Sequence, residues 1–188
     1  WKQYNMRDTE ILAKFVVMLL NFMRDELGEI AYTAPGFALK VYMRKFKPEK
    51  IRLFPPKDER VRKLELESYF GGRTEVFKLG RFESVSVLDV NSMYPTVMRN
   101  LIVPVRPLGY IQNMDVSKLR ELVEKNVPVI ARVLVNIPTD IYVAPVPYRA
   151  RTGKVIFPVG RFITVLTTPE LKLVINWVET VYEAVVYK

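Results

Sequence analysis

The chain has 188 residues, 49% of them apolar, with a formal net charge of +9 and a pI near 9.7. It has no Cys and no His, which excludes disulfides, thiolate zinc sites, Ser-His hydrolases and histidine general bases. Any metal must be held by oxygen ligands, which favours Mg²⁺ or Mn²⁺, and the positive charge indicates either a nucleic-acid partner or a basic surface that binds nothing.

The first part of the chain predicts two helices. Apolar residues recur at helical spacing over residues 8–27, and because the apolar arc is wide we expect this helix to be buried on most sides. Gly28 predicts its end. A second helix is expected within residues 32–46, beginning after Pro35 and Gly36.

Residues 40–63 are rich in Lys and Arg and poor in acids, and Pro48, Pro55 and Pro56 interrupt them. This pattern predicts a linker-like crossing rather than a long helix. A solvated charged loop is one interpretation, and a surface that faces DNA is the other.

Residues 84–90 alternate, so that Val85, Val87 and Asp89 share one face of a predicted strand. A short helix is expected over residues 95–101, because Pro95 is well suited to a first helical turn. This arrangement places a carboxylate at a strand end. It also places free backbone N–H groups at a helix start, where phosphates bind readily.

The remainder predicts a mixture of helices and strands. A helix is expected at 116–125 with Leu119, Leu122 and Val123 inward, and a strand at 127–137. Thr167 or Thr168 is expected to cap a helix that runs to about residue 180, before a last strand at 181–187. Loops and short edge strands are expected around the prolines between these elements, namely Pro138, Pro145, Pro147 and Pro158.

The order Asp89-Val-Asn-Ser-Met-Tyr-Pro95 resembles motif A of family B DNA polymerases, most closely in the protein-primed and plasmid or viral branch. The resemblance implies nucleotidyl transfer assisted by two Mg²⁺ or Mn²⁺ ions. Asp89 would bridge the ions and the carbonyl of Val90 would add a ligand. The backbone N–H groups of Ser92 and Met93 would hold phosphate oxygens of a dNTP.

Tyr94 would then lie beneath the sugar, where its ring excludes a 2′-hydroxyl and so selects dNTP over rNTP. The structural alternative is that Asp89 caps the helix from Pro95 and that Tyr94 belongs to the core.

The order Tyr4-Asn-Met-Arg-Asp8 resembles the third motif of the 3′-5′ exonuclease domains in the same family. The resemblance implies that Asp8 binds a catalytic metal and that Tyr4 orients the attacking water. On a helix the spacing places both side chains on one face. The alternative for Asp8 is a helix N-cap, and Glu10 is assigned no role.

Tyr69-Phe70-Gly71-Gly72 resembles the Tyr-x-Gly-Gly motif between the exonuclease and polymerase domains, which implies a contact with template DNA. Two glycines allow close approach to phosphates, and Arg73 adds charge. The alternative is a plain Gly-Gly turn. Residues 154–160 and then 168–172 resemble the stretch after motif A in plasmid and viral members. Residues 103–188 are interpreted either as an insertion that contacts a terminal (priming) protein or as a structural palm extension.

The Asp-Thr-Asp motif, the Lys-rich fingers motif and the first two exonuclease motifs are not found in the sequence. We therefore expect an inactive fragment of a longer polymerase whose remaining chain supplies them, working on DNA primer-template and dNTP. A non-catalytic subunit that binds DNA or a priming protein is the alternative, and an unrelated basic DNA-binding domain is a third. The implied setting is intracellular, cytoplasmic in a prokaryotic or viral host cell, without a membrane, and the composition suits a hot habitat.

The expected fold is α+β, in three parts. Residues 1–47 form the C-terminal end of an exonuclease domain, 48–80 a basic linker that carries the Tyr-x-Gly-Gly motif, and 81–188 a palm portion with an antiparallel sheet and helices.

Overall fold

The computed structural model describes residues 1–28, 30–47 and 55–188. These residues form two compact units, Trp1–Leu53 and Phe54–Lys188. Pro48 and the start of the predicted linker lie outside the described residues.

The N-terminal unit begins with a 26-residue helix, α1 (Lys2–Leu27), which starts six residues earlier than the sequence predicts. Its end is confirmed, since Gly28 adopts the left-handed conformation (φ 70°) and its N–H donates to the carbonyl of Arg24 at 2.7 Å. The second helix, α2 (Ala34–Val41), starts before Pro35, and a π-helical turn (Tyr42–Phe46) continues it. The hydroxyl of Thr33 caps it by accepting from the Gly36 N–H at 3.2 Å.

The burial expected for α1 is wrong for the described chain. Ile11, Phe15 and Met18 are more than half exposed, and buried Met23 lies near the end of the helix. The rings of Phe22 and Phe37, 5.9 Å apart, join this end to α2. Because α2 is short, it covers too little of α1 to bury the wide apolar arc.

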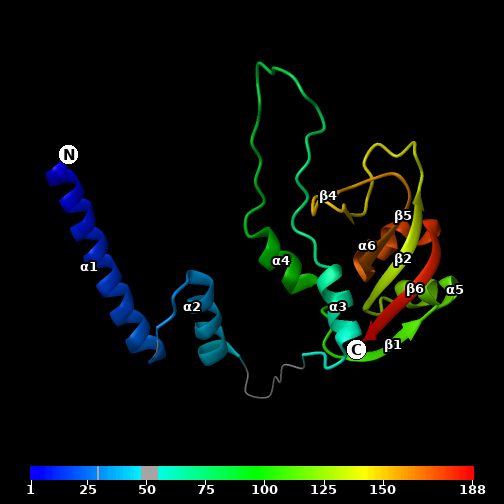
Figure 1. The fold of residues 1–188 in the computed structure, drawn as a ribbon, viewed down its shortest axis with the longest axis horizontal. Helices are drawn as coiled ribbons and strands as arrows, with labels where there is room; N and C mark the ends of the chain where they lie inside the picture. The colour runs from blue at the N-terminus through cyan, green and yellow to red at the C-terminus, as the bar shows by residue number, and fades with distance from the viewer. Residues whose placement is uncertain (29, 48–54) are drawn as a thin grey trace. The chain divides into compact units, whose positions relative to one another are not determined.

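The C-terminal unit is built on a four-stranded antiparallel sheet in the order β1-β6-β2-β5 (Figure 1). The strands are β1 (Pro107–Gln112), β6 (Val178–Tyr187), β2 (Val129–Ile137) and β5 (Gly160–Thr167). A separate hairpin pairs β3 (Tyr148–Arg149) with β4 (Val155–Ile156). The predicted antiparallel sheet and the α+β class are confirmed, although the sequence analysis missed β1 and β5.

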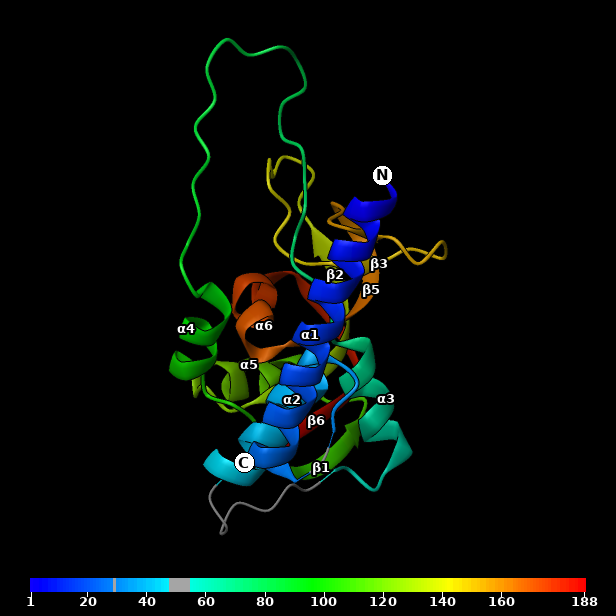
Figure 2. The same ribbon diagram turned by 90° about the vertical axis from the view of Figure 1, so that its left-hand side faces the viewer.

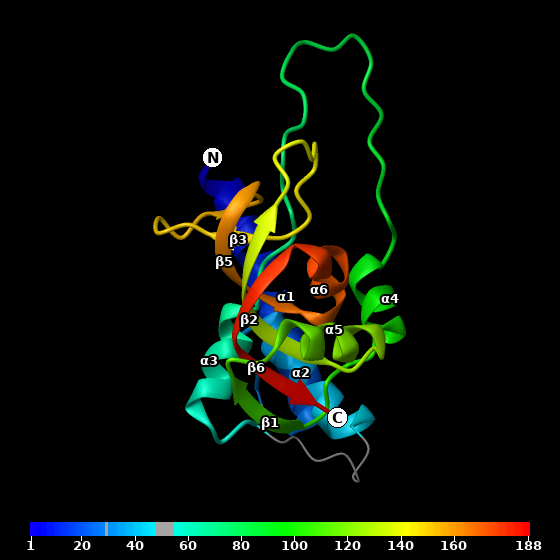
Figure 3. The same ribbon diagram turned by 90° about the vertical axis from the view of Figure 1, so that its right-hand side faces the viewer.

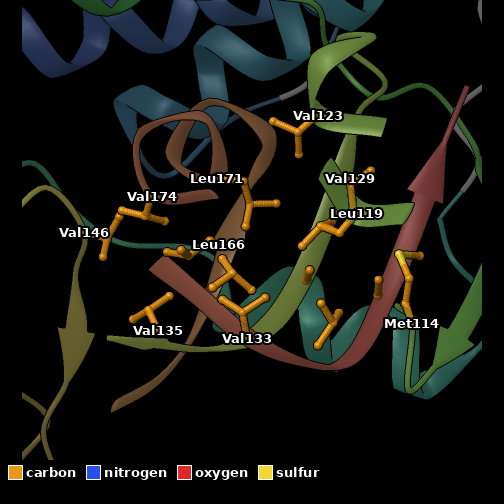
Figure 4. Packing of buried hydrophobic residues seen from close by; sticks show 14 of the residues in the cluster. Met114, Leu119, Val123, Val129, Val133, Val135, Val146, Leu166, Leu171 and Val174 are labelled. Carbon is orange, nitrogen blue, oxygen red and sulfur yellow. The ribbon is translucent and has the colours of Figure 1, made fainter. Parts of the chain in front are cut away.

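Helices α5 (Val116–Glu124) and α6 (Thr168–Val174) cover one face of the sheet (Figures 2 and 3). Alternate residues of β2 point to this face and are buried, since successive strand residues face opposite sides. Figure 4 shows the resulting core, in which side chains from the two helices meet those of the strands, among them Leu119, Val123, Val129, Val133, Val135, Leu166, Leu171 and Val174. The predicted inward positions Leu119 and Val123 are confirmed, and Leu122 is half-buried.

Helix α3 (Glu59–Glu67) packs on the other face of the sheet, opposite α5 and α6 (Figures 2 and 3). Val61 and Leu64 are buried there in one cluster with Ile130, Val165, Val185 and Tyr187. The carboxylate of Asp58 caps the helix by accepting from the Arg60 N–H at 2.9 Å. The prediction of an irregular crossing up to residue 63 is therefore wrong at its end, because two apolar residues one turn apart fold this segment onto the sheet.

The capping of α6 is confirmed. Glu170 accepts from the Thr167 N–H at 2.8 Å in a capping box. The helix ends at Val174, however, and a 3₁₀ turn (Ile175–Trp177) leads directly into β6. The predicted extension to about residue 180 is wrong, because Val178 and Val181 are buried as strand residues that pair with β2.

A long loop without helix or strand, residues 69–92, leaves α3, extends away from the sheet and returns to α4 (Met93–Asn100), as Figures 1 and 3 show. We call residues 82–92 its returning arm. The strand predicted at 84–90 is wrong, because the described residues offer this arm no neighbouring strand to pair with. Its alternating side chains are exposed instead, with Val87 92% and Leu88 93% accessible.

Candidate active site

The segment that follows Asp89 turns sharply into α4. Ser92 adopts the left-handed conformation (φ 52°, ψ 38°), and the Met93 N–H donates to the carbonyl of Val90 at 3.3 Å. The helix then begins at Met93, so the expected helix start beside Tyr94 is confirmed, with Pro95 in the first turn. Ser92 makes no side-chain cap, which leaves backbone N–H groups of the first turn without a capping oxygen.

Asp89 is exposed in the returning arm, three residues before the N-cap of α4. Its carboxylate and the carbonyl of Val90 are hard oxygen donors of the kind that Mg²⁺ prefers. Among residues 1–28, 30–47 and 55–188, no three acidic side chains gather into a metal-binding group. A divalent-metal site at Asp89 and Val90 therefore stays a prediction, because the described residues bring no further carboxylates to it.

Tyr94 and Gly72 meet although they lie far apart in the sequence. A Cβ atom added to Gly72 would lie 2.8 Å from the Tyr94 hydroxyl, which is closer than real Cβ contacts come. A side chain at residue 72 would therefore have to displace the end of the Tyr94 side chain. The contact joins the Tyr-x-Gly-Gly segment to the start of α4, and sequence reasoning did not predict it. Tyr94 is otherwise 67% exposed, so it is not a core residue.

The Tyr-x-Gly-Gly segment itself presents an exposed surface. Tyr69 is largely accessible, and a Cβ atom added to Gly71 would meet no atom within 4 Å. Arg73 is less free, since its guanidinium bonds Glu75 and donates to the carbonyl of Ala144 at 2.8 Å. The predicted contacts of these residues with DNA stay predictions.

Tyr4 and Asp8 lie in α1, in the other unit, and both are exposed. Their spacing of four places them on one face of the helix, as expected. Because α1 begins at Lys2, Asp8 lies inside the helix and is not its N-cap. The N-cap alternative is therefore wrong, whereas the exonuclease role stays a prediction.

A charged cluster that the sequence analysis missed joins α3 to the sheet. Arg132 of β2 forms ion pairs with Glu67 of α3 and, at 2.5 Å, with Glu183 of β6, and the Tyr110 hydroxyl donates to Glu183. Burial opposes the ionisation of Glu183, but the hydrogen bonds from Tyr110 and Arg132 outweigh it and hold its pKa below the ordinary value. The sequence signal for this cluster was a single Arg inside a predicted strand rich in Val and Ile. A charged side chain in such a strand needs partners of opposite charge when it is removed from water.

No helix in the described ranges combines the length and the apolar character needed to cross a membrane. Comparison with curated proteins and with solved structures gives no match. A model of the family described as "DNA polymerase type B, organellar and viral" matches residues 1–188. The chain therefore belongs to the organellar and viral type B DNA polymerases.

Proposed function

We propose that this chain forms part of the nucleotidyl-transfer centre of a template-directed DNA polymerase. The observation that carries the proposal is the contact between Gly72 and the Tyr94 hydroxyl. The two segments that resemble polymerase motifs meet in one place, beside exposed Asp89 and the start of α4. Family membership supports the general activity.

In this proposal Asp89 and the carbonyl of Val90 hold Mg²⁺ or Mn²⁺, and carboxylates of the remaining polymerase chain complete the site. The ions, when bound, stabilise charge on the phosphates. The Ser92 N–H binds a phosphate oxygen of the dNTP at the start of α4. The Met93 N–H binds another by exchanging its 3.3 Å hydrogen bond to the Val90 carbonyl, which then becomes free to bind the metal. The ring of Tyr94 lies beneath the sugar and leaves no room for a 2′-hydroxyl.

The other assignments extend this proposal along the chain. Residues 1–47 form the end of a proofreading exonuclease domain, with Asp8 as a metal ligand and Tyr4 as the residue that orients water. Residues 48–80, the basic linker segment, lead to the palm portion, 81–188, and their helix α3 packs on its sheet. Tyr69, Gly71 and Gly72 contact the template, with Arg73 adding charge, and the sheet after residue 103 offers a surface to a priming protein.

Two substitutions in the complete enzyme test the centre by separating a steric role from an electrostatic one. Tyr94→Val opens space beneath the sugar, so rejection of rNTP should weaken by at least tenfold while dNTP incorporation largely survives, since a tenfold change needs only about 1.4 kcal/mol. Asp89→Asn removes a metal-binding charge, so incorporation of both sugars should fall by a factor on the order of 10³ or more. Incorporation of dNTP and rNTP on a primed template measures both effects.

Tyr32→Val provides a matched control, because Tyr32 is an exposed tyrosine of the other unit. It should leave sugar discrimination unchanged. Unchanged discrimination in Tyr94→Val would remove the steric assignment, and normal synthesis by Asp89→Asn would contradict the proposed centre.

A further inference from the structure

Two arginine-carbonyl hydrogen bonds that run in opposite directions join the Tyr69–Arg73 segment to the segment before and within β3. The Arg149 Nη2 donates to the carbonyl of Tyr69 at 2.9 Å. The Arg73 Nη1 donates to the carbonyl of Ala144 at 2.8 Å. One bond holds the first residue of the motif segment, and the other holds the residue that follows its two glycines.

Ring contacts strengthen both attachments. The Arg149 guanidinium lies 5.1 Å from the ring centroid of Phe70, and the Arg73 guanidinium lies 4.0 Å from that of Phe157. Such cation-π contacts are attractive because the face of an aromatic ring carries partial negative charge. Each arginine is therefore fixed by a carbonyl on one side and by an aromatic face on the other.

The segment that receives these bonds is itself fixed to the sheet. Ala144 and Val146 are buried in the core, and the buried Thr164 hydroxyl of β5 donates to the carbonyl of Pro147 at 2.8 Å. A hydrogen bond to a rigid backbone fixes its donor more tightly than a bond to a mobile loop. The sheet of the C-terminal unit therefore sets where residues 69 and 73 lie.

Between the two attachments, the backbone of Gly71 stays open and that of Gly72 lies against Tyr94. The ends of the segment are thus fixed while its centre is left uncovered. The Tyr94 hydroxyl lies beside the position that a Cβ atom of Gly72 would occupy, so a shift of the segment changes how Gly72 meets Tyr94.

We infer that Arg149 and Arg73 are positioning residues, which hold Gly71 and Gly72 beside Tyr94 by anchoring the segment to Ala144–Arg149. Arg73 then acts through the backbone of Ala144, and Arg149 acts through the backbone of Tyr69. The effect on DNA rests on the proposed function, whereas the anchoring itself does not.

Backbone ¹⁵N relaxation of the 188-residue chain tests the anchoring without DNA. Arg149→Met and Arg73→Met keep much of the side-chain length but remove the donors. The order parameters of the Gly71 and Gly72 amides should fall to about 0.6 or less in both variants, because that range marks a flexible backbone. Arg149→Lys retains a charged donor group and should restore part of the order.

Arg151→Met is the matched control, since Arg151 lies in the turn of the same hairpin, is exposed, and forms no ion pair within the described residues. Its order parameters at Gly71 and Gly72 should match those of the unchanged chain. Equal order parameters in Arg149→Met and Arg151→Met would overturn the inference.

Binding to primer-template DNA at several salt concentrations, measured by fluorescence anisotropy, separates positioning from direct contact. Arg149→Met should weaken binding by about three- to tenfold and leave the slope of log affinity against log salt unchanged, whereas a lost phosphate contact changes it by about 0.9. A slope change of that size would contradict a positioning role. Absence of salt-dependent binding by the unchanged chain would instead contradict the proposed function and leave the relaxation result standing.

Discussion

Strand β2 and the returning arm of the long loop carry similar side chains in different surroundings. Both alternate β-branched residues, yet Val133 and Val135 of β2 are fully buried whereas Val87 of the arm is 92% exposed. Strand β2 pairs with β5 on one side and β6 on the other. The arm has no pairing strand within the described residues, which shows that pattern favours extended backbone while neighbours decide burial.

The two regions also differ in what holds them. Both faces of β2 are covered, one by α5 and α6 and the other by α3. The long loop is held near its base by Arg73 and Arg149 and, through Gly72, by Tyr94. Stability should therefore be concentrated in the sheet, and the loop should contribute little to it.

A leucine pair should show the largest contrast. Leu166→Ala creates a cavity in the core and should lower the free energy of unfolding by about 2–5 kcal/mol. Leu88→Ala, at an exposed site of the returning arm, should change it by about 0.5 kcal/mol or less. Urea unfolding of the 188-residue chain measures both. Losses of similar size would show that the arm packs against something in solution.

Substitutions at the N-caps of α6 and α4 should differ in stability by an intermediate amount. Thr167→Ala removes the capping box of α6 and should cost about 1 kcal/mol. Ser92 caps α4 with no side-chain bond and has a positive φ, so Ser92→Gly should be neutral or stabilise by about 0.5–1 kcal/mol. Urea midpoints of the two variants test the difference. A loss in Ser92→Gly that equals the loss in Thr167→Ala would contradict it.

The smallest difference between the sheet and the loop should be in the acid dependence of the melting temperature. The pKa of Glu183 lies below its ordinary value of 4.5 in the folded chain, so its contribution is present above that pH and is lost as the pH falls through the folded pKa. In Glu183→Gln, the decline of melting temperature between about pH 5 and pH 3 should become shallower. Glu83→Gln, in the exposed loop, is the control and should follow the unchanged chain. A steeper decline of melting temperature in Glu183→Gln would contradict a lowered pKa of Glu183 in the folded chain.

The sequence correctly predicted those helix ends that carry a capping residue. Gly28 ended α1, and Thr167 with Glu170 began α6, because these residues satisfy backbone groups at helix ends. Helix α3 was missed because charged residues surround Val61 and Leu64, and their partners come from strands far along the chain. The extension of α6 was wrong because an apolar run cannot distinguish a helix from a buried strand without its neighbours.

For the candidate site, the sequence predicted the helix that begins beside Tyr94 and singled out both motif segments. It did not predict that Gly72 contacts Tyr94, or that Arg73 reaches Ala144, because such contacts depend on how distant segments fold together. The expected strand before Asp89 required a partner that the described residues do not provide. Short sequence patterns thus identified the candidate site residues, whereas the contacts between them depend on the folded structure.

The position of β6 has a consequence for synthesis on the ribosome. This strand lies between β1 and β2, although it follows the other described strands in the sequence. Nascent β1 therefore emerges early with no hydrogen-bonding partner, and β2 has one open edge until Tyr187 has been translated. Such distant pairing slows folding and exposes strand edges meanwhile, so the nascent chain should depend on chaperone protection until β6 has left the ribosome.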